Sequence, residues 1–224
     1  MSDNKVASKI KFFDTIKHSF YLFFCAGSIR QVDNCSEEFA TVRRKFSRKW
    51  ASEKGPCPPI DSVYAITNTT LEQKWKAYGR KVLLKEVKEY YHGTMLACNI
   101  TRSSTLCNKG ECGICGIANE GLDKNCISQA SFQRFGQGFY LAPNSSKAHD
   151  YTRTCNGYVC KAMLLCDVYP GIKHEFQRNK RQLKGPPPGC NSVYGEIGED
   201  LNYPELVVYD ADAVMPRYII VYRG

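Results

Sequence analysis

The stretch GQGFYLAPNSSKAHDY, residues 136–151, joins a glycine-hinged turn, a short aromatic strand and a polar segment that ends in a second tyrosine. Gly136 and Gly138 have no Cβ, so the backbone of this turn can approach a ligand closely. Tyr140 and Tyr151 are spaced to form two walls of a pocket for a flat ring, because aromatic faces stack while their hydroxyl groups stay polar. Taken alone, the stretch also fits an ordinary hairpin in a β-rich core.

Two further segments favour a binding pocket over an ordinary hairpin. Upstream, the sequence Tyr-Tyr-His-Gly-Thr occupies residues 90–94. Downstream, Glu205 enters a β-branched strand pattern, and a second such pattern follows at residues 218–222. A histidine, a tyrosine and a glutamate, each beside a strand pattern, therefore follow one another in this order along the chain.

The ordered set of His92, Tyr140 and Glu205 resembles the His-Tyr-Glu triad of the diphtheria-toxin-like ADP-ribosyltransferases, the poly(ADP-ribose) polymerase catalytic domain family. Residues 63–68 resemble the first strand of that domain, and the PPGCNSV stretch at residues 187–193 resembles one found in tankyrases. The resemblance implies an α+β fold, the ADP-ribosyltransferase fold, with two packed antiparallel β-sheets and peripheral helices.

The resemblance also implies that NAD is the substrate and assigns roles to individual residues. His92 would hydrogen-bond the adenine-proximal ribose, and the backbone of Gly93 would hold the nicotinamide carboxamide. Tyr140 and Tyr151 would sandwich the nicotinamide ring. Glu205 would bind the nicotinamide-ribose 2′-hydroxyl and stabilise the positive charge that develops on the sugar. The predicted catalytic residues are Glu205, His92 and Tyr140, and the predicted NAD-binding residues are His92, Gly93, Thr94, Tyr140, Ser146 and Tyr151.

Two departures from the family pattern bear on activity. Ala148 stands where many members have a serine that bonds the carboxamide, and a missing neutral hydrogen bond costs about 0.5–1.5 kcal/mol. Ser145 or Ser146 could supply a substitute hydroxyl. The segment between Val193 and Glu205 is short, and the corresponding loop positions the acceptor in this family, so single transfer is favoured over polymer formation. A weak or inactive module that binds NAD or ADP-ribose, and an NAD glycohydrolase, are the alternatives.

One catalytic domain behind an accessory segment is the predicted organisation. With 224 residues and 43% hydrophobic content, the chain is long enough for one sizeable core. The proline cluster at residues 55–59 divides a basic accessory segment, 1–60, from a catalytic domain, 61–224. Residues 43–50 have helical spacing, and the apolar periodicity of residues 71–88 predicts a second helix.

The formal net charge is +9, from 31 Lys and Arg against 22 Asp and Glu. Much of the excess lies in the basic N-terminal helix and in the loop at residues 173–184, where it suits the NAD phosphates or an acceptor macromolecule. Nucleic acid fits this charge, but no nucleic-acid motif accompanies it. The family resemblance implies a protein acceptor as the expected partner, and a solvated basic surface explains the charge most simply. No apolar stretch reaches the eighteen or so residues that would span a bilayer.

The chain has 12 cysteines, and four of them lie close together in sequence between the histidine and tyrosine motifs. Cys98, Cys107, Cys112 and Cys115 are spaced as ligands of a structural Zn²⁺ ion, and the glycines between them would let the loop wrap around it. Disulfides and free thiols are the alternatives. The tankyrase zinc loop lies after the tyrosine motif, so its ligands have no counterparts here.

The cellular compartment is only weakly indicated. The apolar run at residues 20–26 follows several lysines and ends near small residues at 26–28, a pattern that a secretory signal also shows. A buried or amphipathic N-terminal element is the favoured interpretation of this run. The cytoplasm or nucleus is therefore expected, with secretion as the alternative.

Overall fold

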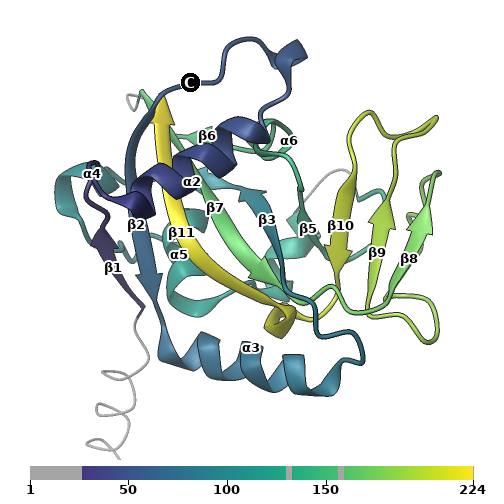
Figure 1. Ribbon diagram of the computed structural model, residues 1–224. Coiled ribbons are helices and arrows are strands. Elements are labelled where there is room, and N and C mark those ends of the chain that lie inside the picture. The colour runs from purple at the N-terminus through teal and green to yellow at the C-terminus, as the bar shows by residue number, and fades with distance from the viewer. Residues whose placement is uncertain (1–26, 130–132, 156–158, 224) are drawn as a thin grey trace, which may run out of the picture.

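The computed structural model describes residues 27–129, 133–155 and 159–223 (Figure 1). Its largest layer is a five-stranded sheet in which all neighbouring strands are antiparallel. In spatial order its strands are β1 (Ser28–Gln31), β2 (Ile60–Thr67), β11 (Val214–Arg223), β7 (Cys160–Val168) and β3 (Lys88–Gly93). β2 and β11 are rich in Val, Ile and Tyr, which pack well on a half-buried pleated surface.

A second, four-stranded sheet lies beside the first. Its strands in order are β5 (Phe139–Leu141), β10 (Glu205–Val208), β9 (Ser192–Gly195) and β8 (Lys173–Phe176). β10 is antiparallel to both of its neighbours, whereas β8 runs parallel to β9. The predicted α+β fold with two sheets is confirmed, and the edge strand β8 makes the second sheet mixed. A small parallel pair, β4 (Met95–Leu96) and β6 (Arg153–Thr154), completes the pairing.

The two sheets are joined where β3 meets the end of β5. Tyr91 N donates a 2.7 Å hydrogen bond to Ala142 O, and Ala142 N donates a 2.8 Å bond back to Tyr91 O. Because His92 follows Tyr91 and Tyr140 lies just before this bridge, the pairing brings the histidine and tyrosine motifs together.

The helix α2 (Glu37–Arg48) confirms the helical spacing of the basic stretch, although it begins earlier than residue 43. Ser36 caps it, with Oγ accepting a 3.1 Å hydrogen bond from Phe39 N. The helix buries Phe39, Val42 and Phe46 against the five-stranded sheet. The described part of the predicted accessory segment thus contributes both a sheet strand and a core helix, and the boundary at residue 60 stays a prediction.

The helix α3 (Thr69–Lys81) is shorter than the sequence predicted. Asn68 caps its start, with Oδ1 accepting a 3.1 Å bond from Leu71 N. The periodicity of residues 71–88 predicted a helix that continues to residue 88. This predicted end was wrong, because the helix stops at Lys81. Val82 is already extended, because the chain must turn there to begin β3. The remaining helices are α4 (Ile100–Ser103), α5 (Gly113–Glu120) and α6 (Ser145–His149), with 3₁₀ turns η1 (Ser52–Lys54), η2 (Lys124–Gln129) and η3 (Ala211–Ala213).

The strand β11 shows how the large sheet serves two hydrophobic clusters, because successive side chains point to opposite faces. Ile219 and Val221 pack with α5 and strands of the second sheet, whereas Ile220 and Tyr222 pack with α2. In Figure 1, α2 crosses the near face of the sheet and the second sheet stands to its right. Within the described ranges, no helix is long and apolar enough to cross a membrane. The apolar run at residues 20–26 lies outside those ranges.

Candidate active site

A cavity of about 630 Å³ lies where the two sheets meet, a volume in the range of small-molecule sites. It contains nearly all of the residues predicted to bind NAD or to act in catalysis. The predicted residues in its lining are His92, Gly93, Thr94, Tyr140, Tyr151 and Glu205. Segments far apart in sequence therefore converge on one site.

His92 is held by the strand that carries the tyrosine. Its Nδ1 lies 2.9 Å from Tyr140 O. A carbonyl oxygen only accepts, so Nδ1 carries the proton in this contact and Nε2 is left as an acceptor. Burial lowers the pKa of His92, which keeps the ring neutral and able to accept a hydrogen bond from a sugar hydroxyl.

Tyr140 presents its ring to the cavity because the preceding turn satisfies its hydroxyl. Tyr140 Oη donates to Gly136 O at 2.9 Å and accepts a bond from Phe135 N at 2.8 Å. Gly136 has φ +70°, and a Cβ there would lie 1.8 Å from Leu183 O, so this turn requires glycine. The sequence-predicted hinge thus fixes the orientation of the tyrosine.

Glu205 is the first residue of β10 and is 2% exposed. The pairing of Leu206 with Leu141 and of Val207 with Tyr140 places the carboxylate beside the tyrosine strand. Its Oε1 has no hydrogen-bond partner among the described residues and lies 4.0 Å from Arg134 Nε. Desolvation by burial raises the pKa of Glu205, and the charges of Lys147 and Arg134 act in the opposite direction.

The helix α6 supplies Lys147 and Ala148 to the cavity, and Tyr151 follows it. Lys147 Nζ lies 5.0 Å from the centre of the Tyr151 ring, and Tyr151 is 48% exposed at the mouth of the site. Ala148 is buried against β3: a Cβ on Gly93 would lie 2.0 Å from Ala148 O. This contact leaves room for glycine alone at the position predicted to hold the carboxamide.

Ser146 is not brought to the cavity with the other predicted NAD-binding residues. Its Oγ accepts a 3.2 Å bond from Ala51 N, while Ser145 Oγ donates a 2.7 Å bond to Phe46 O. Both serines are buried on the side of α6 that faces the N-terminal segment. In this arrangement neither hydroxyl replaces the one that Ala148 lacks.

Two cationic residues of the site were missed by the sequence analysis. Lys147 stands within the very stretch that identified the tyrosine motif, but the sequence does not show which side of the short helix α6 faces the cavity. Arg134 carries no such signal. It is held by Asn179 Oδ1 at 3.3 Å and by a hydrogen bond to Asp200 O, contacts that only the folded chain reveals.

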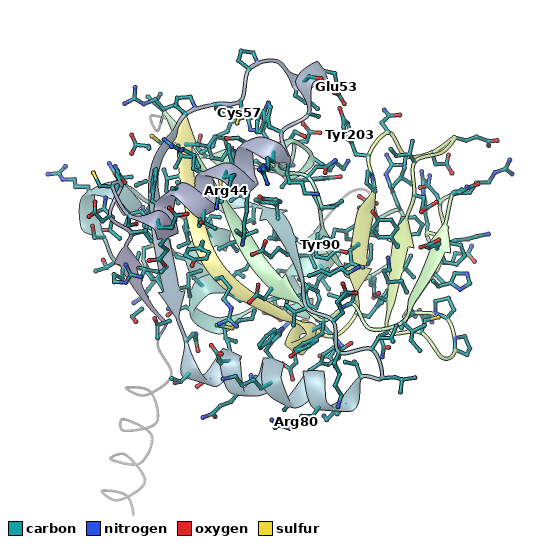
Figure 2. The ribbon with its side chains drawn as sticks, in the orientation of Figure 1. Arg44, Glu53, Cys57, Arg80, Tyr90 and Tyr203 are labelled. Atoms are coloured by element: carbon teal, nitrogen blue, oxygen red, sulfur yellow. The ribbon has the colours of Figure 1, made fainter. Side chains whose placement is uncertain are left out.

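The 3₁₀ turn η1 contacts the segment just before Glu205, which the sequence also did not indicate. Tyr203 Oη donates a 2.8 Å bond to Glu53 Oε1, and the two side chains meet in Figure 2. Lys54 Nζ bonds Asp150 Oδ1 at 2.8 Å and lies 5.5 Å from the centre of the Tyr203 ring. These contacts link the segment before Glu205 with the segment around Tyr151.

A four-cysteine group lies next to the cavity and could bind a metal ion. The sulfur atoms of Cys98, Cys107, Cys112 and Cys115 all lie within 4.8 Å of one another. Cys107 is half-buried and the other three are buried, and all four are free thiols. The sequence-predicted ligand set is therefore brought together in space.

Comparisons with known proteins agree with this geometry. The family described as "Poly(ADP-ribose) polymerase catalytic domain" matches residues 36–197. Human protein mono-ADP-ribosyltransferase PARP3 is 23% identical over 167 residues, which cover 74% of this chain and 27% of the relative. Mouse protein mono-ADP-ribosyltransferase PARP4 is 22% identical over 203 residues, covering 86% of this chain and 9% of the relative. The chain thus spans about a quarter or less of the length of these relatives.

The family match confirms the predicted enzyme class, that of NAD⁺ ADP-ribosyltransferase catalytic domains, and it covers both the His92 and the Tyr140 motif. By sequence and by the arrangement of its site, the chain belongs to the poly(ADP-ribose) polymerase catalytic domain family.

Proposed function

We propose that this chain transfers ADP-ribose from NAD to a protein side chain, once per acceptor site, and releases nicotinamide. The observation that carries the proposal is the carboxylate of Glu205, which is buried in the same cavity as His92 and Tyr140 and has one oxygen without a hydrogen-bond partner. A buried polar atom without a partner costs free energy. A ribose hydroxyl of NAD would supply the missing hydrogen bond.

The reaction breaks the bond between nicotinamide and ribose, and the bonding electrons leave with nicotinamide. Tyr140 and Tyr151 would flank the nicotinamide ring, and the backbone of Gly93 would hold its carboxamide. His92 Nε2 would accept a hydrogen bond from the adenine-proximal ribose. Glu205 would accept one from the 2′-hydroxyl and stabilise the sugar as positive charge develops on it. The acceptor then forms the new bond to the sugar and loses its proton to solvent or to Glu205.

Single transfer is proposed over polymer formation for two reasons. The relatives named above are called protein mono-ADP-ribosyltransferases. In addition, only a short segment, residues 196–204, connects β9 to β10 beside Glu205. A short connection offers little surface for holding a growing polymer as the acceptor.

A second candidate function is a weak or inactive module that binds NAD or ADP-ribose. The observation in its favour is Ala148, which is buried in the cavity wall and provides no hydroxyl for the carboxamide. Retention of His92, Tyr140 and Glu205 in one cavity favours transfer.

The test is incubation of the protein with NAD labelled in its adenylate half, with and without a mixture of acceptor proteins. Transfer places the label on protein and releases an equal amount of nicotinamide. Intact-mass analysis should show separate single additions rather than a ladder of polymer lengths. Free labelled ADP-ribose would indicate a glycohydrolase, and unchanged NAD that nevertheless binds would indicate the inactive module.

We also propose zinc as the ion of the four-cysteine group, because four thiolates suit this metal. Such a site closes the tetrahedral coordination and leaves no position for NAD, so the ion would be structural. Zinc-bound thiolates at these four positions would suit a reducing compartment, the cytoplasm or nucleus. Pairing of the same thiols as disulfides in purified protein would instead favour secretion.

A further inference from the structure

The four-cysteine group and the cavity share one segment of chain. Cys107 and Cys112 belong to both, and three glycines near them also line the cavity. These glycines are Gly110, Gly113 and Gly116. Residues 107–127 therefore supply one part of the cavity lining, while β3, β5, α6 and β10 supply the other.

The sulfur atoms are spaced as a tetrahedral site requires. Ligands about 2.3 Å from a tetrahedral zinc ion lie about 3.8 Å from one another. Cys98 Sγ is 3.6 Å from Cys115 Sγ and 3.8 Å from Cys112 Sγ. Ala97 N donates a 3.3 Å hydrogen bond to Cys112 Sγ, the kind of outer contact that orients a metal-binding thiolate.

The group connects the start of α5 to the strand that carries His92. Cys98 follows β4, which in turn follows His92–Thr94, while Cys112 and Cys115 belong to the first turn of α5. The backbone of α5 also presses on this strand, since a Cβ on Gly113 would lie 2.3 Å from Thr94 Oγ1. A metal ion bound by these sulfurs would therefore connect the start of α5, on one side of the cavity, to the segment that follows His92–Thr94 on the other side.

The far end of α5 has a separate attachment. Asn68 Nδ2 donates bonds to Asn119 O at 2.7 Å and to Ala118 O at 3.2 Å. Asn119 Oδ1 also accepts a 2.8 Å bond from Gly27 N. Loss of the metal would thus release the start of α5 and the loop before it, while the end of the helix stays anchored on the five-stranded sheet.

We propose that zinc at Cys98, Cys107, Cys112 and Cys115 acts as a latch for the cavity wall, so that NAD affinity depends on zinc occupancy. The inference rests on the proposed function for the identity of the ligand. A protein whose binding-competent state is only partly populated binds with an affinity lowered by that fraction. Opening of the wall in nine molecules out of ten would thus weaken NAD binding about tenfold.

The chain offers a matched pair of variants for the test. Cys115→Ala removes a metal ligand that does not line the cavity, and Cys166→Ala removes an equally buried thiol of β7 outside the group. Zinc content, thiol count and NAD affinity by calorimetry are measured for the wild type and both variants. The wild type is also measured after chelation and after zinc is added back. Hydrogen exchange reports whether protection is lost only in residues 98–116 or throughout the sheet.

The wild type and Cys166→Ala should each hold about one zinc ion and bind NAD alike. Cys115→Ala and the chelated protein should bind NAD at least about tenfold more weakly. Exchange should rise in residues 98–116 while β7 and β11 stay protected, and added zinc should restore both properties of the wild type. Zinc-free protein that binds NAD as tightly as holoprotein would overturn the latch, as would wild type purified without zinc. Zinc-dependent NAD binding without transfer would leave the latch standing and refute the proposed transfer.

Discussion

At the scale of single residues, the environment of Glu205 opposes its ionisation while the proposed reaction requires it. Burial disfavours the carboxylate, and one of its oxygens lacks a hydrogen-bond partner. Lys147 and Arg134 partly offset this by their positive charge. The side chain is therefore a source of instability that NAD would relieve on binding.

The first prediction concerns this instability and its pH dependence. A carboxyl group whose folded pKa lies above its ordinary value holds more protons when folded than when unfolded, so its contribution to stability falls as pH rises. Glu205→Gln should therefore raise the melting temperature at neutral pH and leave it nearly unchanged at about pH 3, well below the ordinary pKa of a glutamate, where the carboxyl group is largely protonated in both the folded and the unfolded state. Calorimetric melting curves of the two proteins at both pH values provide the measurement. A lower melting temperature for the variant at neutral pH would contradict the claim that the buried carboxylate of Glu205 destabilises the folded protein.

The raised pKa of Glu205 also predicts how the transfer rate falls at acidic pH. Transfer requires ionised Glu205, so the rate should fall as pH drops through a pKa above the ordinary 4.5 of a glutamate. Values of kcat/KM for NAD, measured from acidic to neutral pH, report the free enzyme and give this midpoint. A midpoint at or below 4.5 would show that the carboxylate is not desolvated in the free enzyme.

A second residue-scale prediction follows from Ala148. Ala148→Ser should tighten NAD binding by up to about tenfold, the value of one neutral hydrogen bond to the carboxamide. Ala142→Ser is the control, because it adds the same hydroxyl to another buried alanine of the cavity lining. Calorimetric titration with NAD compares the two. Equal or weaker binding in Ala148→Ser would mean that the carboxamide is held in another way.

The sequence pointed to site residues where a residue type and its order in the family gave the signal. His92, Tyr140 and Glu205 line one cavity, and the catalytic roles that the resemblance implies for them stay predictions. Ser146 does not join them, because rotation along α6 turns it toward Ala51 while the next residue, Lys147, faces the cavity. A short helix of uncertain register does not reveal such a direction in advance.

At the scale of elements, the contact between β3 and α6 sets the shape of the nicotinamide end of the cavity. Gly93→Ala would place a Cβ about 2.0 Å from Ala148 O, a backbone atom that cannot rotate away. The two elements must then separate, and NAD binding should be lost or weakened by more than about tenfold.

The matched control is Gly116→Ala in α5, where a Cβ would meet nothing within 4 Å although the residue lines the same cavity. Alanine favours a helix over glycine by about 1 kcal/mol, so this variant should melt at an equal or higher temperature and keep its NAD affinity. NAD titration of both variants provides the measurement. Unchanged affinity in Gly93→Ala would refute the close contact between β3 and α6.

The ends of helices and strands are set by tertiary contacts, which could not be predicted from the sequence. The periodicity of Leu71, Trp75 and Tyr78 indicated α3 correctly, since these side chains do face the molecule. Its end at Lys81 is set by the need to start β3 at Lys88, which local pattern cannot show. The parallel pairing of β8 with β9 likewise depends on the path of the chain between them.

At the scale of the whole molecule, the N-terminal segment shares a hydrophobic cluster with Tyr91 and Ala142, which lie next to the site residues in the chain. Phe46 is fully buried beside Tyr222 of β11, and its carbonyl oxygen accepts a bond from Ser145 in α6. Phe46→Ala should therefore destabilise the whole domain by about 3–5 kcal/mol. Arg43→Ala, on the exposed face of the same helix, should have little effect.

Urea unfolding of the two variants, followed by the fluorescence of Trp50 and Trp75 and by circular dichroism, checks this prediction. One cooperative transition, shifted to lower urea only in Phe46→Ala, would show that α2 and the sheet unfold together. An unchanged main transition would support an N-terminal segment that is energetically separate, as the predicted boundary at residue 60 implies.

The central claim is that one cavity, built around His92, Tyr140 and Glu205, breaks the nicotinamide–ribose bond of NAD. The most direct measurement compares wild type with Glu205→Gln for both nicotinamide release and NAD affinity. The side-chain oxygen of glutamine can still accept the ribose hydrogen bond, whereas the negative charge of the carboxylate acts mainly on the transition state. We therefore expect the rate to fall by about 10²–10³ while the dissociation constant for NAD stays nearly unchanged. Equal losses of affinity and rate, or no loss of rate, would contradict the role assigned to Glu205 and with it the proposed reaction.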